Sequence, residues 1–125
     1  MDNFLKIQKP NIENGLISIR SNGGLRYFKT SDLVLLNSDL NYTEIHLISG
    51  QKIVSSRSLL LFEGALKACR LFIRANRSQL INISHVKELC FSGKNKKIML
   101  TNGSIVEVSR RKFTVVENHL KLKMP

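Results

Sequence analysis

The amino-acid sequence predicts a mainly β protein of antiparallel strands, with one short internal helix and a C-terminal helical segment. Apolar residues fall mostly in short runs, and residues that favour turns separate these runs. Two hairpin signals, Ser49-Gly50 and Gly93-Lys94-Asn95, lie between stretches that read as strands. Helical spacing is confined to two stretches. Short strands joined by tight turns favour an antiparallel fold.

The N-terminal third contains an expected arm followed by three strands. Residues 1–15 include Pro10 and a polar run, which is typical of a linker or a fraying arm. We therefore expect the folded domain to span residues 16–122. The first β-type runs lie at residues 16–20, 25–28 and 33–37, with turn-forming residues between them.

A hairpin and the internal helix follow. Residues 41–48 alternate between apolar and polar side chains, and the Ser49-Gly50 turn leads into a second strand at 51–55. Ser58 is a suitable N-cap for a helix. The helix would bury a stripe formed by Leu59, Phe62, Leu66 and Cys69.

The second half returns to strands and ends in a helix. The expected strands lie at residues 71–75, 80–83, 86–91, 97–100 and 104–108. After them, Phe113, Val116 and Leu120 recur at helical spacing, and Ser109 precedes them as an N-cap. No pair of consecutive helices is expected, so a helix-turn-helix is excluded.

Size and composition predict one soluble, cytoplasmic domain. A chain of 125 residues is long enough for a single core, and no apolar run approaches the roughly 20 residues of a membrane span. Cys69 and Cys90 are expected to be buried, reduced thiols because no metal-ligand spacing surrounds them. His46, His85 and His119 are too scattered for a metal site, and we expect no cofactor.

The positive charge is concentrated in the second part of the chain. The net charge is +11, and residues 51–125 hold 15 Lys or Arg against 4 Asp or Glu. Arg110, Arg111 and Lys112 occupy the first turn of the expected C-terminal helix, where each cation is disfavoured by about 0.3–1 kcal/mol. An anion such as phosphate would reverse this penalty, although a solvated basic turn is the simpler alternative. The asymmetry predicts a polyanionic partner.

The order of several short motifs resembles the LytTR family of bacterial DNA-binding domains. These motifs are Asn41-Tyr42-Thr43, Arg57-Ser58-Leu59, the stretch from Phe72 through Arg74, Asn76, Arg77 and Ser78 to Asn82, then Asn102-Gly103 and Val108-Ser109-Arg110-Arg111. The resemblance covers roughly residues 16–122. It implies a compact LytTR-like β sandwich that inserts loop residues into successive major grooves of promoter DNA. Members commonly carry a further N-terminal domain, so the chain is either a free-standing regulator or a response regulator output domain.

By position, the resemblance places DNA contacts at Asn41, Tyr42, Asn76, Arg77, Arg110 and Arg111. Arg77 or Arg111 fits a two-pronged contact with guanine, and Asn41 or Asn76 fits adenine. Arg57, Arg110, Lys112 and Lys94 fit phosphate contacts. Both asparagines equally suit a turn. Tyr42 fits a half-buried position on a strand better than a DNA contact.

Three neighbouring features have structural interpretations. Arg74 lies on the same strand face as Phe72. Its side chain is expected either to pair with another residue of the protein or to contact DNA. Asn82 is expected to satisfy buried backbone groups. The cluster Lys94, Lys96 and Lys97 is expected to be a solvated hairpin tip that can extend the electrostatic surface.

The leading hypothesis is a transcription regulator that binds double-stranded DNA, with two copies pairing on promoter repeats. The alternative is a basic module that binds a membrane surface or an acidic protein partner, although no basic amphipathic helix with exposed aromatics is present. RNA binding would favour paired surface aromatics, which a 6% aromatic content hardly supplies. No catalytic pattern indicates an enzyme. The sequence does not specify a signalling partner.

Overall fold

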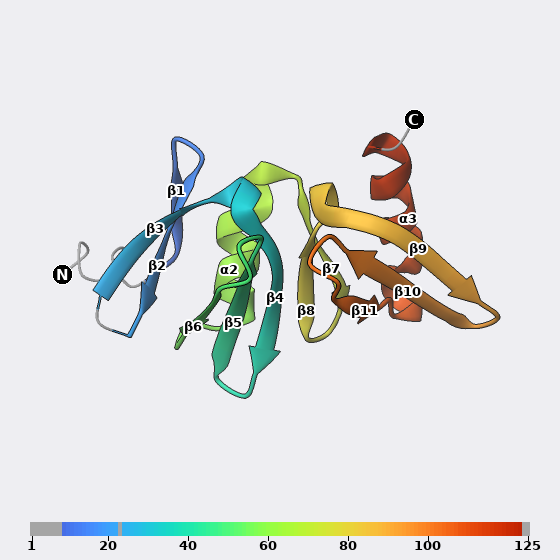
Figure 1. The fold of residues 1–125 in the computed structure, drawn as a ribbon, viewed down its shortest axis with the longest axis horizontal. Coiled ribbons are helices and arrows are strands. Elements are labelled where there is room, and N and C mark those ends of the chain that lie inside the picture. Colours follow the sequence, from blue (N-terminus) through green and yellow to red (C-terminus); the bar gives the residue numbers. More distant parts are fainter. Residues whose placement is uncertain (1–8, 23, 124–125) are drawn as a thin grey trace.

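Three antiparallel sheets follow one another along the long axis of the molecule (Figure 1). The computed structural model describes residues 9–22 and 24–123. The elements are β1 (Asn11–Glu13), β2 (Leu16–Ser21), β3 (Gly24–Lys29), η1 (Thr30–Asp32), β4 (Leu33–Asp39), β5 (Tyr42–Leu47), β6 (Lys52–Ser55), α2 (Leu59–Leu66), η2 (Lys67–Cys69), β7 (Phe72–Asn76), β8 (Gln79–Asn82), η3 (Ile83–His85), β9 (Val86–Ser92), β10 (Asn95–Leu100), β11 (Ile105–Glu107) and α3 (Arg110–Lys123).

The first sheet has the order β1-β2-β3 and begins before the predicted domain boundary. Strand β1 lies within the expected arm and pairs with β2 in a register that places Ile12 opposite Ile17. Ile12 packs against the core formed by Ile17 and Ile19, which explains why this short polar-flanked segment is ordered as a strand. Residues 1–8 of the expected arm lie outside the described part of the chain.

The central sheet has the order β6-β5-β4-β8-β7 and separates two hydrophobic cores. Strand β4 begins with four consecutive buried residues, Leu33–Leu36. Leu33 and Leu36 contribute to the core shared with the first sheet and α2, whereas Val34 and Leu35 contribute to the core shared with the third sheet and α3. A continuous apolar run is what a strand covered on both faces requires.

The third sheet, of order β11-β10-β9, and α3 complete the second core. Ile98 and Leu100 of β10 and Val116 and Leu120 of α3 are buried together there. The helical spacing of Phe113, Val116 and Leu120 therefore predicted α3 correctly. The helix begins at Arg110, directly after Ser109. The Ser109 carbonyl accepts a hydrogen bond from the Lys112 N–H at 3.0 Å.

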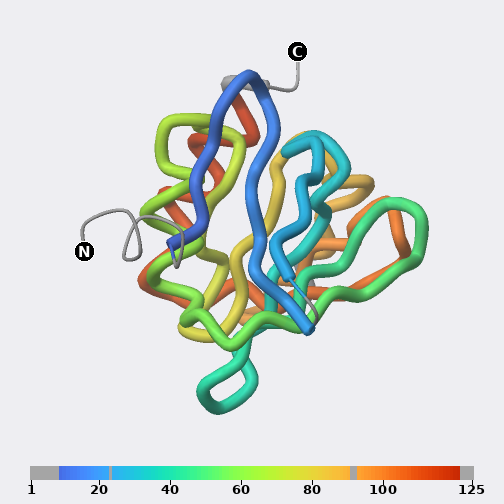
Figure 2. The backbone as a smooth tube through the Cα atoms, turned by 90° about the vertical axis from the view of Figure 1, so that its left-hand side faces the viewer, coloured from blue at the N-terminus to red at the C-terminus, as the bar shows by residue number. Residues whose placement is uncertain are grey.

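Helix α2 begins as its sequence predicts. The Ser58 side chain accepts a hydrogen bond from the Leu61 N–H, and Leu59, Phe62 and Leu66 are buried. The apolar stripe was expected to reach Cys69, but the α-helix ends at Leu66 and Cys69 lies in the following η2 turn. Both α2 and α3 lie on the same side of the molecule, the left-hand side of Figure 2.

Asn82 confirms the prediction of a buried amide that satisfies the backbone. Its Nδ2 donates to the Leu33 carbonyl at 2.9 Å, and its Oδ1 accepts from the Ser84 N–H at 3.0 Å. The side chain thereby joins the end of β8 to the start of β4. Buried amides need such partners because an unsatisfied polar group costs about 1–3 kcal/mol.

The prediction that both thiols are buried is wrong. Cys90 is exposed on β9, and Cys69 is half-buried against the first core. Both are free cysteines. Leu89 of β9 packs against the second core, so the period-two alternation of the strand turns the next residue, Cys90, to the opposite face. None of the helices that the structure describes has both the length and the hydrophobicity needed to cross a membrane.

Candidate nucleic-acid interface

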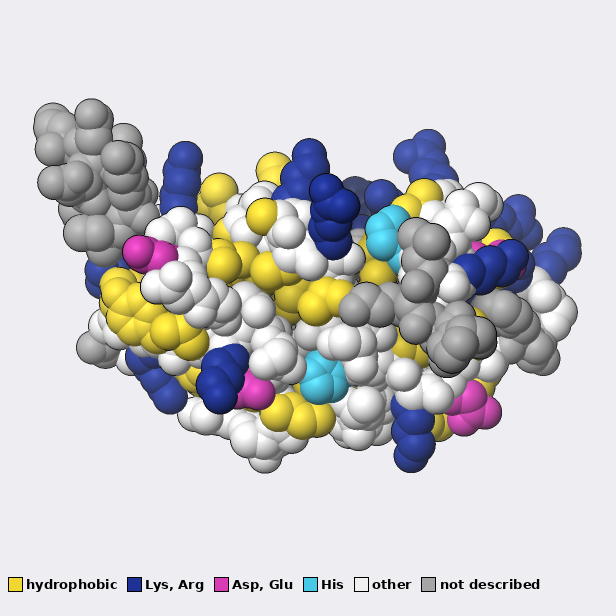
Figure 3. Space-filling model, turned by 90° about the horizontal axis from the view of Figure 1, so that it is seen from above, with side chains coloured by type: hydrophobic (Ala, Val, Ile, Leu, Met, Phe, Trp, Pro, Cys, Tyr) yellow, Lys and Arg dark blue, Asp and Glu magenta, His cyan; other side chains and the backbone are white. Residues whose placement is uncertain are grey.

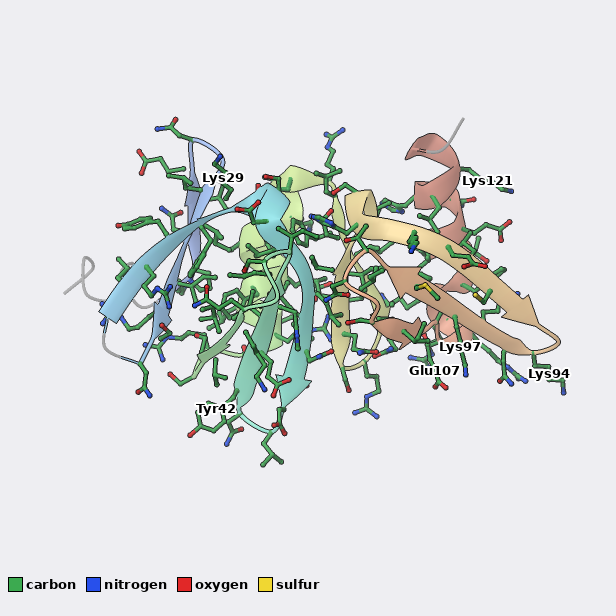
Figure 4. The ribbon with its side chains drawn as sticks, viewed as in Figure 1. Lys29, Tyr42, Lys94, Lys97, Glu107 and Lys121 are labelled. Carbon is green, nitrogen blue, oxygen red and sulfur yellow. The ribbon has the colours of Figure 1, made fainter. Side chains whose placement is uncertain are left out.

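The turns that carry the predicted DNA contacts lie along one edge of the molecule, the lower edge in Figure 1. This edge contains the β4–β5 and β7–β8 turns and the starts of α2 and α3, with the β9–β10 turn at its right-hand end. Side chains labelled there in Figure 4 include Tyr42 and Lys94, whereas Lys29 and Lys121 lie at the upper edge. Segments far apart in the sequence thus converge on one surface.

Two hydrogen bonds fasten the start of α3 to the end of β7. The Ser109 N–H donates to the Ala75 carbonyl at 2.9 Å, and Asn76 Nδ2 donates to the Glu107 carbonyl at 2.7 Å. As a result, Arg77 from the β7–β8 turn and Arg111 from α3 line the same shallow hollow of about 250 Å³. Lys112 lines it as well. With Asn76, which also lines the hollow, the fold brings together four of the predicted site residues.

Arg74 connects the β7–β8 turn to α2 through hydrogen bonds within the protein. Its Nε donates to Glu63 Oε1 of α2 at 3.0 Å, and its side chain is only 17% exposed. A second nitrogen of Arg74 donates to the Arg77 carbonyl. Of the two roles left open for Arg74, the structure shows the internal one: it is a support that fixes the backbone from which Arg77 projects.

The Asn76 amide is fully engaged within the protein. Besides Glu107, its Nδ2 donates to Gln79 Oε1 at 2.8 Å, and its Oδ1 accepts from the Ser78 N–H at 2.9 Å. The bond to Ser78, two residues further on, is the Asx-turn geometry that favours asparagine in turns. Of the two roles considered for Asn76, the geometry supports the turn.

Arg110 lies on the other side of the α3 start. It lines a second hollow, of about 350 Å³, with Lys94 and Lys96 of the β9–β10 hairpin. Lys96 differs from the expected solvated lysine: it is half-buried, and its Nζ lies 3.0 Å from the centre of the Phe113 ring. This cation–π contact removes Lys96 from the solvated tip. Lys94 and Lys97 remain exposed.

The first turn of α3 is thus flanked by cations on both sides. It contains no acidic residue. The partial positive charge of the helix start adds to these side chains. In physical terms, this surface attracts an anion with several separated negative charges rather than a single one.

The β4–β5 turn projects furthest from the lower edge. Asn41 is exposed, and Tyr42 is 52% exposed, so about half of the tyrosine surface is covered. Tyr42 begins β5 directly after the hairpin turn, where it pairs with Asp39. It lines a polar groove with Arg20, Arg26 and Lys52.

The residue that the sequence analysis overlooked is Leu40. It is 92% exposed and adopts a left-handed backbone with φ of 56°. Leu40 and Asn41 form a two-residue hairpin loop, because Asp39 pairs with Tyr42. Glycine is favoured at the first loop position when φ is positive. A solvent-exposed leucine in such a position has a strained backbone and an apolar side chain in water. The signal in the sequence was a leucine between the polar residues Asp39 and Asn41.

Arg57 lies in the loop between β6 and α2, at the same edge. Its side chain donates to Ser56 Oγ at 3.0 Å, and its carbonyl accepts from Thr43 Oγ1 at 2.7 Å. Because Thr43 is fully buried in β5, this hydrogen bond fixes the loop before Ser58 relative to the β4–β5 hairpin. Arg57 is half-buried and thus more constrained than Arg77 or Arg111.

The histidines are dispersed. His46 lies between Glu44 and Asn37, His85 contacts Thr101 and the Ser31 carbonyl, and His119 contacts the Val115 carbonyl of its own helix. Within residues 9–22 and 24–123, no three His, Cys, Asp or Glu side chains are grouped so that they could hold a metal ion.

Comparisons with known proteins identify the family and the fold. The model of the LytTr DNA-binding domain family matches residues 23–121. Among solved structures, the fold is similar to a LytTr DNA-binding domain of a putative methyl-accepting/DNA response regulator from Bacillus cereus. The TM-score is 0.72 at 18% identity, and the match covers 86% of this chain and 98% of that one. A search of curated protein sequences found no match. The family model spans most of the chain, which therefore belongs to the LytTR family of DNA-binding domains.

Proposed function

We propose that the chain is a cytoplasmic, sequence-specific transcription regulator that reads successive major grooves of double-stranded DNA with loop residues. The observation that carries this proposal is the convergence of the β4–β5, β7–β8 and β9–β10 turns and the α3 start on one edge. These turns carry exposed cations, and loops held on a rigid scaffold are suited to recognition.

Arg77 and Arg111 are the proposed base readers of one groove. Both are exposed and both line the same hollow, so two guanidinium groups reach the same part of a bound duplex. Each can donate two hydrogen bonds to guanine O6 and N7. The backbone that carries them is fixed by Arg74, Asn76 and Ser109. Such preorganisation reduces the entropy lost on binding.

Lys112, Arg110, Lys94 and Arg57 are the proposed phosphate contacts. Lys112 is half-buried beside Arg111, while Arg110 and Lys94 line the neighbouring hollow. Their arrangement on both sides of the α3 start suits the two phosphate strands that border a groove. Asn76 is proposed to act through the position of the turn rather than through a base.

The β4–β5 turn is the proposed reader of a second groove. Asn41 can pair with adenine N6 and N7, and Tyr42 supplies an exposed ring and hydroxyl. We add Leu40 to the predicted contacts because its exposed side chain can pack against a thymine methyl group. That contact would offset the exposure and backbone strain of Leu40 in the free protein.

Two copies are proposed to bind repeated half-sites. One small domain with two or three reading loops covers about one turn of DNA, so a second copy at a spacing of about 10 base pairs adds affinity on the same face of the duplex. The free protein is then expected to be a monomer.

Selection of tight-binding duplexes from a random library tests the proposal. We expect the selected sequences to share a repeated motif and to bind at least about a thousandfold more tightly than their shuffled versions at physiological salt. Selection without a shared motif would refute sequence-specific reading. In parallel, sedimentation with anionic phospholipid vesicles tests the membrane alternative. Vesicle binding that survives excess selected duplex would show that another surface or another partner is involved.

A further inference from the structure

A groove of about 790 Å³ lies between α2 and α3, and it adjoins the hollow of Arg77 and Arg111 because Glu63 lines both. It extends past the end of α2 to Arg70, and α2 runs from the lower edge toward the upper edge (Figure 1). Figure 3 views the molecule from that upper edge and shows hydrophobic surface near the middle, with Lys or Arg side chains and a histidine beside it. Apart from Glu63, the residues that line the groove do not line the hollow of Arg77 and Arg111.

The floor and one wall of the groove are apolar. Phe72 at the start of β7 and Ile83 of η3 form the floor, and Leu60 of α2 adds a wall that is 69% exposed. Leu60, Gly64 and Lys67 recur at a spacing of four and three residues, so the groove follows α2 to the start of η2, roughly 10 Å. A large apolar side chain left exposed in a groove indicates a surface that another molecule covers.

Gly64 provides a second, independent observation. A glycine in the interior of a helix destabilises it relative to alanine. No neighbouring atom explains this glycine, because a Cβ placed there would meet nothing within 4 Å. Gly64 lines the groove, so the missing side chain leaves space for an occupant to approach the α2 backbone closely.

The rim of the groove is cationic. Lys67 and Arg70, which follow the last turn of α2, line the groove, and His119 of α3 lines it as well. Among the residues that the structure describes, neither Lys67 nor Arg70 forms an ion pair. The acidic residue of the groove, Glu63, already pairs with Arg74. An occupant with apolar and acidic groups would therefore be complementary to the groove.

The shape favours a helix over an extended strand. Strand β7 is an edge strand of the central sheet, but Ser109 bonds to Ala75 and Asn76 bonds to Glu107, so the β11–α3 segment covers the second half of that edge. Too little of the strand remains open for strand addition. Two flanking helices and an apolar floor instead form the kind of groove that binds an amphipathic helix.

We propose that this groove docks an acidic amphipathic helix of a partner protein while the domain is bound to DNA. Apolar side chains of that helix pack on Leu60, Phe72 and Ile83, its backbone lies against Gly64, and its acidic side chains pair with Lys67 and Arg70. The contact would connect the DNA-bound domain to another protein without using the base-reading loops.

A synthetic peptide of about 18 residues tests the proposal, with leucine at i, i+3, i+4 and i+7 and glutamate elsewhere. Its fluorescence anisotropy is titrated with the full chain, in the absence and presence of saturating duplex. Two peptides serve as controls: one has the same composition in shuffled order, and one carries lysine in place of glutamate. We expect binding of the first peptide alone, with the affinity retained on DNA.

Two variants test the groove without endangering the fold. Gly64→Ala should raise the melting temperature, because alanine favours the helix, yet weaken peptide binding by at least about fivefold. Arg70 has a φ of 59°, a conformation that glycine adopts readily, so Arg70→Gly should fold well and weaken binding about two- to fivefold. Lys29→Ala, which removes an exposed cation of β3 that does not line the groove, is the control and should bind normally. All three variants should bind duplex DNA as the parent does.

The opposite results would overturn the inference. Displacement of the peptide by duplex DNA would show that the peptide binds at the DNA-binding edge. The same conclusion would follow if Arg111→Ala reduced the affinity for the peptide as much as Arg70→Gly does. Equal binding of the shuffled peptide would refute an amphipathic helix. Binding of dodecanoate at the groove, without the peptide, would identify a site for a small amphiphile instead. None of these outcomes depends on whether the domain reads specific DNA sequences.

Discussion

The side-chain amide of Asn76 donates a hydrogen bond of 2.7 Å to the main-chain carbonyl of Glu107. The two residues are 31 positions apart and belong to different sheets. This contact joins the turn that carries Arg77 to the segment that leads into Arg110 and Arg111. The relative position of these three proposed DNA contacts therefore depends on an asparagine that does not itself need to touch DNA.

Replacing Asn76 with alanine should consequently weaken DNA binding through position. The substitution removes bonds to Glu107, Gln79 and Ser78, so the free energy of unfolding should fall by about 1–2 kcal/mol. Chemical denaturation measures this loss, and affinity for selected and shuffled duplexes is measured at a temperature where the variant is folded. Asn118→Ala, at an exposed position of α3, is the control and should change neither quantity. An unchanged stability of Asn76→Ala would contradict the positioning role.

Arg111 and Lys112 should separate base reading from phosphate contact. Arg111→Ala should lose about 1–3 kcal/mol on the selected duplex and little on shuffled DNA, because a base contact is removed. Lys112→Ala should weaken both duplexes about equally and lower the salt slope by about one. Anisotropy titrations at several salt concentrations measure both effects, with Lys29→Ala as the control at the opposite edge. If Arg111→Ala lost the same binding free energy on both duplexes, Arg111 would contact phosphate rather than a base.

The same two variants should not destabilise the free domain. Each cation in the first turn of α3 opposes the partial positive charge of the helix start. Removing one should leave stability unchanged or raise it by about 0.3–1 kcal/mol. A clear decrease in the melting temperature would show that these side chains hold the fold together.

Leu40→Gly should make the free protein more stable and the complex weaker. Glycine adopts the φ of 56° without the penalty of about 1–2 kcal/mol that an L-residue has in this conformation. The substitution also removes the exposed side chain that we assign to a thymine methyl contact. Thermal melts measure the expected gain in stability, and duplex titrations measure the expected loss of DNA affinity. A variant that is more stable and binds DNA as tightly as the parent would show that Leu40 makes no contact.

The local pattern predicted most elements because each has a local cause. The cap at Ser58, the stripe in α3 and the Leu33–Leu36 run each follow from short-range chemistry. The sequence could not predict that Arg77 and Arg111 meet, because this depends on long-range bonds such as that of Ser109 with Ala75. The local pattern also predicted the wrong environment for Cys90 and Lys96. The exposure of a strand residue such as Cys90 depends on which face of its sheet packs against the core. The burial of Lys96 depends on its contact with the ring of Phe113.

Affinity for any duplex should fall steeply as salt is raised. The excess of cations in residues 51–125 neutralises phosphates and releases bound counterions. Six or more phosphate contacts would reduce affinity on the order of a thousandfold between 50 and 200 mM salt. Anisotropy with a shuffled duplex measures the slope directly. A flat dependence would be incompatible with the cationic edge as the binding surface.

The spacing of the two half-sites should determine whether two copies bind together. Copies at about 10 base pairs lie on the same face of the duplex, whereas an insertion of five base pairs turns them to opposite faces. If the pair is stabilised by contact or by shared DNA distortion, occupancy of the second site should fall after this insertion and recover after an insertion of ten. Quantitative footprinting on the three duplexes measures occupancy at each half-site. Equal occupancy on all three would show that the copies bind independently, and the proposed pairing would be wrong.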